Sequence, residues 1–344
     1  MKILTSFIVI LLVGLCRAAP TSNDDDEDII ITKEFYADTF VKYTGEHNIV
    51  NLLLPINSLN FDENDSSESD SNSNSNEEDT DITLFFVEAD EDDEGNRIDQ
   101  GLYVLHRGQA KKLLDHGRDA AASGDDSKLV FFGAKDGIYV YNQKDNSAEK
   151  YGTIDDSIIS IAKEKSGDVI YILTEDRNVY KVTEDGTKKE LLDDIVKAKQ
   201  IVLDYNNNIY FYSDDKVPYV RTDDGIKKIE GLPENPTSVT LVKPPFILED
   251  GVPFVVDTNV YIIYANSSSE ESGFKFEPET IPTAYAPEAA LIQYYAFDKK
   301  IYEYNILTIL LGSVLEELKN YLNDKTKEIR SISKQPKHSV LNRA

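Results

Sequence analysis

Six tyrosines recur along this chain at a nearly constant interval, and this repeat constrains the fold more than any other feature. The successive intervals are 36, 41, 39, 42 and 41 residues. Each tyrosine lies in a short alternating apolar run, and a second apolar run, usually ending at an acidic residue, precedes it. A unit of about 40 residues, made of short strands and polar turns, is typical of a β-propeller blade. The spacing predicts an all-β fold, a six-bladed β-propeller over 30–305. The tyrosines are Tyr103, Tyr139, Tyr180, Tyr219, Tyr261 and Tyr302.

Four strand positions can be assigned within the repeating unit. Apolar runs at 157–162, 199–204 and 238–242 predict inner strands, and 49–56 predicts the inner strand of the first blade. The tyrosine falls in the third strand, where we expect it to pack between blades. The fourth strand is amphipathic and carries lysines that we expect to point into solvent and to discourage edge-to-edge association. Nine residues after their tyrosines lie Lys112, Lys189 and Lys228.

The N-terminus predicts a secretory signal peptide over 1–18. Lys2 precedes an apolar run at 3–15, and a small-residue cleavage pattern ends at Ala18. The apolar run is too short to span a bilayer. We therefore expect a secreted, extracellular protein without membrane contact after cleavage. Because Cys16 is the only cysteine, the cleaved chain cannot form a disulfide, and its stability must come from burial between blades.

Four segments depart from the blade pattern. Acidic residues dominate 19–29, which predicts a disordered tail, and 62–81 contains only acidic residues, Ser, Asn and one Thr, which predicts a disordered acidic insert in the first blade. Apolar residues at helical spacing predict a C-terminal amphipathic helix over 306–324, before a basic tail at 325–344. The net charge of −27 argues against nucleic-acid binding. Cations or basic proteins are the partners that would suit the insert.

Motifs for catalysis or metal binding are not recognisable in the sequence. The four histidines, His47, His106, His116 and His338, lack metal-ligand spacing. Nucleophile elbows, Walker motifs and dinucleotide fingerprints are missing as well. We therefore predict a protein that is not an enzyme and uses no cofactor or metal. The run at 204–208 resembles the start of a calcium loop, but Asp and Asn are equally typical of a turn between strands.

Two Asn-X-Ser sequences are candidate glycosylation acceptors in surface loops. They begin at Asn64, within the acidic insert, and at Asn266, between two predicted strands.

Two stretches resemble blades of known propellers. IVLDYNNNIYFYSDD at 201–215 and IAKEKSGDVIYILTEDRNVYKV at 161–182 are similar to blades of the gluconolactonase and NHL-repeat kind. With the small, acidic, secreted format, the chain most resembles the ommochrome-binding proteins of moth and butterfly haemolymph. This resemblance covers 84–304. It implies a six-bladed propeller in haemolymph that carries tryptophan-derived ommochrome pigments.

Our leading hypothesis is a secreted carrier that binds a small aromatic ligand, such as an ommochrome, in the central mouth of the propeller. An extracellular interaction or structural protein that uses its acidic insert is one alternative, and a calcium-dependent hydrolase of the lactonase type is another. Small-molecule sites are mostly apolar with a few polar groups. Strand register gives seven candidate ligand contacts, namely Phe132, Thr174, Gln200, Tyr212, Ser238, Asp257 and Tyr285.

Overall fold

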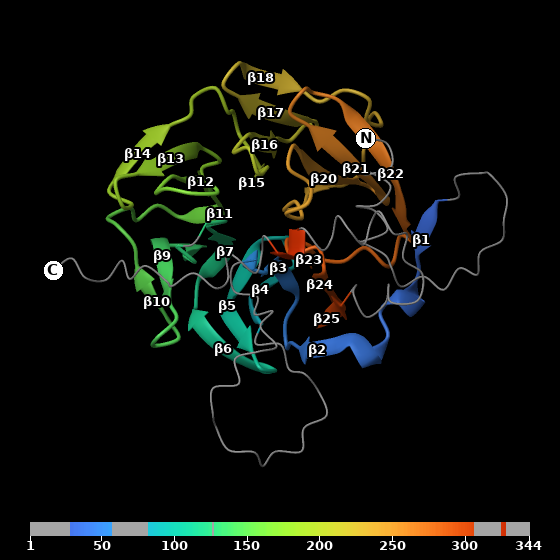
Figure 1. The fold of residues 1–344 in the computed structure, drawn as a ribbon, viewed down its shortest axis with the longest axis horizontal. Coiled ribbons are helices and arrows are strands. Elements are labelled where there is room, and N and C mark those ends of the chain that lie inside the picture. The colour runs from blue at the N-terminus through green and yellow to red at the C-terminus, as the bar shows by residue number, and fades with distance from the viewer. Residues whose placement is uncertain (1–27, 57–81, 126, 306–324, 328–344) are drawn as a thin grey trace, which may run out of the picture.

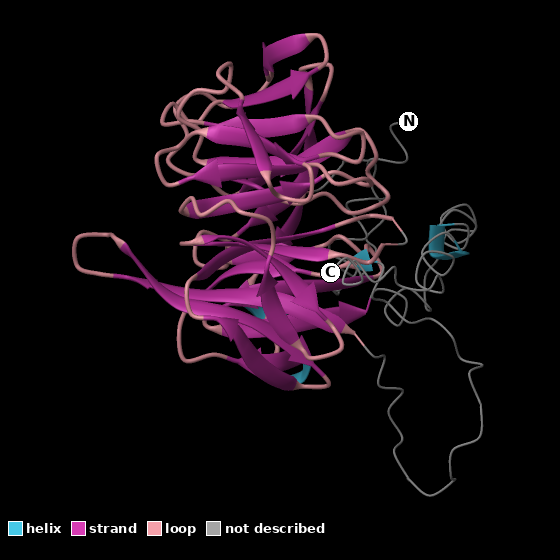
Figure 2. Ribbon diagram, turned by 90° about the vertical axis from the view of Figure 1, so that its left-hand side faces the viewer, coloured by secondary structure: helices cyan, strands magenta, loops and turns pink. Residues whose placement is uncertain are grey.

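The structure, a computed structural model, describes residues 28–56, 82–125, 127–305 and 325–327. Between 28 and 305 it contains six sheets, arranged as blades around a central channel (Figure 1). Seen from the side, strands make up most of the described chain (Figure 2). The predicted six-bladed β-propeller is thereby confirmed. The acidic insert at 62–81, the tail at 19–29 and the helix at 306–324 lie outside the described residues.

Each blade is an antiparallel meander whose strands follow one another outward from the channel. The first three blades comprise β3 (Ile49–Leu53), β4 (Thr83–Glu91), β5 (Arg97–His106) and β6 (Gln109–Leu114); β7 (Gly117–Ala122), β8 (Val130–Ala134), β9 (Gly137–Asn142) and β10 (Ser147–Lys150); and β11 (Ile158–Lys163), β12 (Ile170–Thr174), β13 (Val179–Thr183) and β14 (Lys188–Leu191). The next two comprise β15 (Gln200–Leu203), β16 (Ile209–Tyr212), β17 (Pro218–Thr222) and β18 (Gly225–Lys228); and β19 (Val239–Leu241), β20 (Gly251–Val256), β21 (Asn259–Tyr264) and β22 (Ser269–Phe276). The sixth contains β23 (Ala284–Ala286), β24 (Ile292–Phe297) and β25 (Lys300–Asn305).

Strands near the N-terminus close the ring. β2 (Val41–Thr44) pairs antiparallel with β25 and becomes the outer strand of the sixth blade. β1 (Ile29–Ile31) pairs in parallel with β22 and adds a fifth strand to the fifth blade. The 3-10 helices η1 (Lys33–Phe35) and η2 (Asp38–Phe40) connect these two strands. Because segments far apart in sequence share these sheets, blades five and six depend on the N-terminal segment.

Hydrophobic clusters fill the gaps between neighbouring blades around the ring. All six repeat tyrosines lie in third strands, and each packs in or against the cluster shared with the preceding blade. Tyr103, for example, stacks on Phe86 with ring centroids 5.0 Å apart and planes inclined by 9°. Stacked aromatic pairs of this kind stabilise a core beyond the area that they bury. The regular tyrosine spacing thus records the packing of one blade on the next.

The outer-strand lysines Lys112, Lys189 and Lys228 are exposed, as expected. Lys112 and Lys189, together with Lys150, make a further contact that was not expected, because each ammonium group lies over the repeat tyrosine of its own blade. The distances from Nζ to the ring centroids are 5.4 Å for Lys112, 4.7 Å for Lys150 and 4.9 Å for Lys189. A cation–π contact at an exposed site contributes about 0.5–1 kcal/mol. These lysines therefore cover the half-buried tyrosine rings as well as keeping the sheet edges charged.

A second repeated position fastens one blade to the next. Arg177, Lys216 and Lys299 each lie three residues before a repeat tyrosine, in the turn between second and third strands. All three have positive φ angles, of 66°, 58° and 61°. Their side chains donate hydrogen bonds to backbone carbonyl oxygens just ahead of the next inner strand, at 197–198, 236–237 and 46. The last of these contacts joins the sixth blade to the first.

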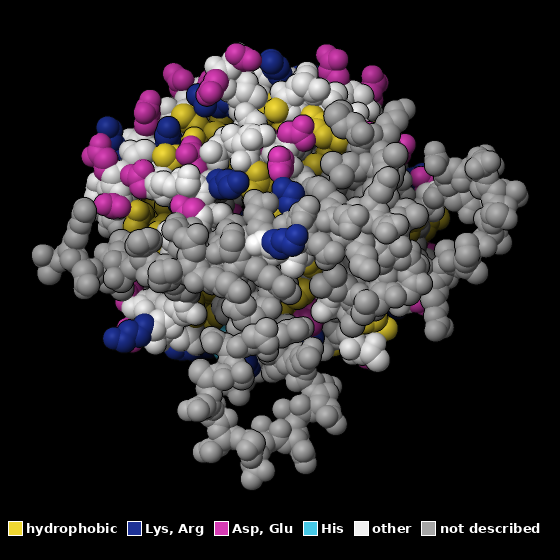
Figure 3. Space-filling view, in the orientation of Figure 1, with side chains coloured by type: hydrophobic (Ala, Val, Ile, Leu, Met, Phe, Trp, Pro, Cys, Tyr) yellow, Lys and Arg dark blue, Asp and Glu magenta, His cyan; other side chains and the backbone are white. Residues whose placement is uncertain are grey.

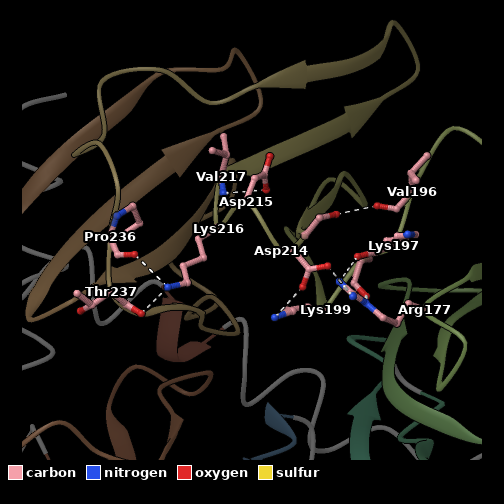
Figure 4. A network of polar contacts seen from close by, with 12 residues as sticks. Arg177, Val196, Lys197, Lys199, Asp214, Asp215, Lys216, Val217, Pro236 and Thr237 are labelled. Carbon is pink, nitrogen blue, oxygen red and sulfur yellow. Dashed lines mark hydrogen bonds and ion pairs between the residues drawn. The ribbon is translucent and has the colours of Figure 1, made fainter.

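Figure 4 shows two of these contacts together with an ion-pair network between blades three and four. Asp214 lies 2.8 Å from Arg177 and 2.9 Å from Lys199. Hydrogen bonds from these two cations lower the pKa of Asp214 to about 2. Around the blades, acidic and basic side chains are interspersed on the face turned toward the viewer in Figure 3.

Candidate functional site

Two cavities lie at opposite ends of the central channel, because they are lined by opposite ends of successive inner strands. One, of about 180 Å³, is lined by the first residues of β7, β11 and β15 and is rich in polar groups, including Asn51 and Ser160. The other, of about 110 Å³, is lined mainly by apolar residues at the strand ends, including Leu54, Ala122 and Leu203. We call them the polar mouth and the apolar mouth.

Asp119 organises the polar side of the channel. This carboxylate on β7 is buried, with 4% of its surface exposed. Its Oδ1 atom accepts hydrogen bonds from the side chain of Asn51 at 2.7 Å and from the Ala120 N–H at 2.8 Å, and its Oδ2 atom accepts from Ser160 Oγ at 2.9 Å and the Ile161 N–H at 2.8 Å. Three consecutive inner strands therefore converge on one carboxylate.

Lys243 lines both cavities and therefore lies between them. Its ammonium group is 3.3 Å from Asp119 Oδ1 and donates to the Ala120 carbonyl oxygen at 2.5 Å. The side chain reaches across the channel from the segment after β19 to β7. Lys243 is partly buried, and a cation withdrawn from water needs a charged or hydrogen-bonding partner, which Asp119 provides.

Glu288 brings a further carboxyl group to the apolar mouth. It lies in the turn between β23 and β24, is 7% exposed, and has Lys243 among the charges that act on it. Within the part of the chain that the structure describes, neither side-chain oxygen of Glu288 has a hydrogen-bond partner. Burial raises the pKa of Glu288 to about 8, although Lys243 and the nearby N–H groups of Glu288 and Leu54 act in the opposite direction. Neither N–H group makes a hydrogen bond of ordinary geometry to the carboxyl oxygens. We refer to Asp119, Lys243 and Glu288 as the channel charge cluster.

The raised pKa of Glu288 predicts a specific dependence of stability on pH. The folded protein keeps this proton up to about pH 8, whereas the unfolded chain releases it near the ordinary glutamate pKa of 4.5. Over that interval the folded state binds more protons, so the free energy of unfolding falls as pH rises. The Glu288→Gln variant cannot ionise and should gain stability over the wild type between pH 5 and about pH 9, by at most a few kcal/mol. Urea titrations across this range measure the difference, and a constant difference would contradict the prediction.

Cations at the rim of the polar mouth are already paired. Arg118 donates to Asp99 at 2.8 Å and Arg97 donates to the other oxygen of the same carboxylate at 2.7 Å. Burial opposes ionisation of Asp99, but these hydrogen bonds hold its pKa below the ordinary value. Gln200 is also engaged, since its side-chain amide donates to the Leu241 carbonyl and accepts from the Leu241 N–H. Most polar groups of this mouth are thus paired, whereas Asn51 Oδ1 and the Tyr285 hydroxyl have no hydrogen-bond partner among the described residues.

Two of the seven predicted ligand contacts line a cavity. Gln200 and Tyr285 both line the polar mouth. The Tyr285 hydroxyl is buried and has no hydrogen-bond partner among the described residues. Phe132 instead is fully buried between the first two blades. Tyr212 packs against the cluster between blades four and five, with its ring 6.4 Å from that of Phe254.

The other three predicted contacts lie near turns and outside the two channel cavities. Thr174 is buried and donates to the Asn178 carbonyl oxygen. Asp257 accepts hydrogen bonds from the Thr237 hydroxyl and from the N–H groups of Thr237 and Ser238. The seven residues therefore do not form a single cluster, and as ligand contacts they stay predictions.

The calcium-like run at 204–208 forms a turn. Asp204 accepts hydrogen bonds from the N–H groups of Asn206 and Asn208, from the Asn208 side chain and from the Tyr210 hydroxyl. Its carboxylate is thus used internally. Among the described residues, no group of three or more His, Cys, Asp and Glu side chains is arranged to hold a metal ion. In the same part of the chain, no helix is long and apolar enough to cross a membrane.

The channel charge cluster was not predicted from the sequence, although two of its members stand out there as isolated charges. Lys243 is the only charged residue between Glu234 and Glu249, and Glu288 is the only one between Glu279 and Asp298. A lone charge in a long apolar run is unusual, because charged residues are rarely buried unless they are paired. Asp119 follows Arg118 directly and gave no comparable signal.

Comparison with known proteins finds similarity at the level of structure. No family model and no curated protein matches the sequence. The virginiamycin B lyase from Staphylococcus aureus is 18% identical, with 63% of this chain and 82% of that chain covered and a TM-score of 0.41. An auxiliary nutrient binding protein from Bacteroides thetaiotaomicron is 9% identical, with coverages of 64% and 65% and a TM-score of 0.45. The extracellular domain of a one-component system from the same organism is 10% identical, with coverages of 78% and 42% and a TM-score of 0.46.

At such low sequence identities the similarity indicates the fold alone. This chain also spans less than half of the third structure's chain. The similar structures nevertheless correct one prediction. We predicted that the protein is not an enzyme, yet the similar structures include a lyase as well as a binding protein. The fold alone does not show whether this protein is an enzyme or a binding protein, because one fold can carry unrelated functions. The exclusion of catalysis is therefore withdrawn.

Proposed function

We propose that this protein is a secreted carrier that binds a small aromatic ligand in the apolar mouth of its channel. The observation that carries the proposal is the composition of this cavity, in which apolar residues surround one buried carboxyl group without a hydrogen-bond partner among the described residues. Ligand sites typically combine an apolar lining with a few orienting polar groups. The resemblance of the blades to ommochrome-binding proteins suggests a pigment of that class as the ligand.

Cavity size limits what can be enclosed. An apolar cavity of about 150 Å³ is large enough for benzene, so the apolar mouth, at about 110 Å³, suits one end of a ring system. The rest of a larger pigment would lie over the rim, near the exposed side chain of Lys165.

Expression with the native leader, followed by pigment binding, tests this function. The protein should be recovered from the culture medium and should retain an ommochrome in equilibrium dialysis. Ala122 lines the apolar mouth, so Ala122→Trp should fill the cavity and abolish binding. Val196 is exposed on the surface and lies outside both cavities, so Val196→Trp is the matched control and should bind as the wild type does. Equal binding by Ala122→Trp and the wild type, or no binding by any form, contradicts the proposal.

A further inference from the structure

Glu288 is fixed in place by the turn that carries it. Ala286, Ala289 and Ala290 around it are fully buried. The Glu288 carbonyl oxygen accepts a hydrogen bond from the Phe246 N–H at 2.9 Å, and the Ala290 N–H donates to the Pro287 carbonyl oxygen at 2.8 Å. These bonds hold the backbone on both sides of the side chain. The backbone that carries the carboxyl group is therefore held in place at the apolar mouth.

Neither oxygen of this carboxyl group forms a hydrogen bond with the described residues. Leaving a buried polar group unsatisfied costs about 1–3 kcal/mol, and more for a charged group. Lys243 is the one cation of the channel charge cluster, but its ammonium group donates to the Ala120 carbonyl oxygen and to Asp119. A bound molecule that donates hydrogen bonds would meet the need of Glu288 directly.

The surroundings of Glu288 define the rest of such a molecule. Its neighbours in the apolar mouth are aliphatic side chains such as Leu54 and Ile56, with the half-buried ring of Tyr205. An apolar, preferably aromatic body fits this lining. An ammonium group is the donor best matched to a carboxylate, because charge-assisted hydrogen bonds are about twice as strong as neutral ones.

We propose that Glu288 anchors the ligand of the apolar mouth and selects apolar molecules that carry an amine. This inference rests on the proposed function, since it names the chemistry of the same site. A ligand carboxylate is the opposing choice, because Lys163, Lys165 and Lys243 also line this cavity. Lys163, however, donates to the carbonyl oxygens of Glu164 and Ser166, and a carboxylate placed against Glu288 would meet a second acceptor.

Three small probes of one shape distinguish these choices, namely benzylamine, benzyl alcohol and benzoate. Ligand-observed NMR titration measures their affinities for the full chain. The test variant is Glu288→Gln, which preserves size and can still accept a hydrogen bond. The control is Glu249→Gln, because Glu249 is an exposed carboxylate whose backbone carbonyl accepts a hydrogen bond from Asn206, next to Tyr205 of this mouth. The control removes an ionised surface carboxylate without touching the cavity, and so measures the general attraction of amines to an acidic protein.

We expect benzylamine to bind the wild type more tightly than benzyl alcohol does, and benzoate to bind most weakly. Glu288→Gln should weaken benzylamine roughly tenfold or more while leaving benzyl alcohol within about twofold. Glu249→Gln should change neither affinity by more than about twofold. Benzylamine should also displace a proton from Glu288 at pH 7, measured by calorimetry in two buffers of different ionisation enthalpy, and Glu288→Gln should release none.

The remaining outcomes separate the two proposals. Equal binding of benzylamine by the wild type and Glu288→Gln, with all probes blocked by Ala122→Trp, overturns the anchor and leaves the ligand site in place. Tighter binding of benzoate than of benzylamine also overturns it and assigns the selectivity to the lysines. If no probe binds the wild type, both the proposed role of Glu288 and the proposed ligand-binding function are contradicted.

Discussion

Replacing Asp119 with alanine is expected to lower the free energy of unfolding by about 3–5 kcal/mol, because it removes a buried carboxylate that accepts several hydrogen bonds and leaves the partly buried Lys243 without its ion-pair partner. Asn51, Ser160 and the Ile161 N–H would each lose their acceptor. Lys243 would lose its ion pair without replacement, because Glu288 keeps its proton up to about pH 8 and supplies no negative charge below that pH. Chemical unfolding followed by circular dichroism measures the loss.

Asp257→Ala is the matched control for Asp119→Ala. Asp257 also accepts several hydrogen bonds, from Thr237 and Ser238, but it lies in an accessible turn where water can replace them. Its removal should cost only about 1 kcal/mol. Similar losses in the two variants would show that the channel network contributes no more than a surface turn does.

A second variant checks that the stability lost in Asp119→Ala arises from the unpaired charge of Lys243. Adding Lys243→Met to Asp119→Ala removes the unpaired cation, and it should restore part of the lost stability. Double-mutant cycles isolate such coupling between contacting residues. An additive effect of the two substitutions would exclude the ion pair as the source of the cost.

Much of the fold was predictable because each blade repeats one local pattern. Third strands were located by their tyrosines, and the runs at 157–162, 199–204 and 238–242 correspond to β11, β15 and β19. The ring closure was not predictable in the same way. β2 has only four residues, and it pairs with β25, about 260 residues away in sequence. Its partner is set by closure of the circle, which no local pattern records.

The candidate site was predicted less well than the fold, for a physical reason. Side chains alternate between the two faces of a strand, so an error of one residue moves a predicted contact from the channel to the core. Phe132 shows a further reason, since it lies in a second strand whose two faces both pack between blades, Phe132 in one cluster and Phe131 in the next. Gln200 and Tyr285 line a channel cavity, and as ligand contacts they stay predictions. The channel charge cluster could be recognised only in the structure, because Asp119, Lys243 and Glu288 are far apart in the sequence.

Replacing Phe35 with alanine is expected to destabilise the closed ring by about 3–5 kcal/mol, the usual cost of truncating a buried aromatic residue. Phe35 is 7% exposed and stacks on Tyr304 with ring centroids 4.4 Å apart. It also meets Tyr295 edge-on at 5.4 Å, and the Tyr304 hydroxyl donates to the Phe35 carbonyl oxygen at 2.7 Å. The side chain therefore fastens the link between β1 and β2 to the sixth blade. Chemical unfolding measures the loss.

Phe40→Ala is the control, because Phe40 belongs to the same segment and meets the same Tyr304 ring at 4.9 Å but is only partly buried. Its truncation should cost clearly less than that of Phe35. Limited proteolysis gives a second measurement, since a weakened Phe35 contact should expose the linker between β1 and β2 to cleavage before the blades themselves. If both variants lose the same stability and the linker stays protected, the strand pairing of β2 with β25 closes the ring without help from this aromatic contact.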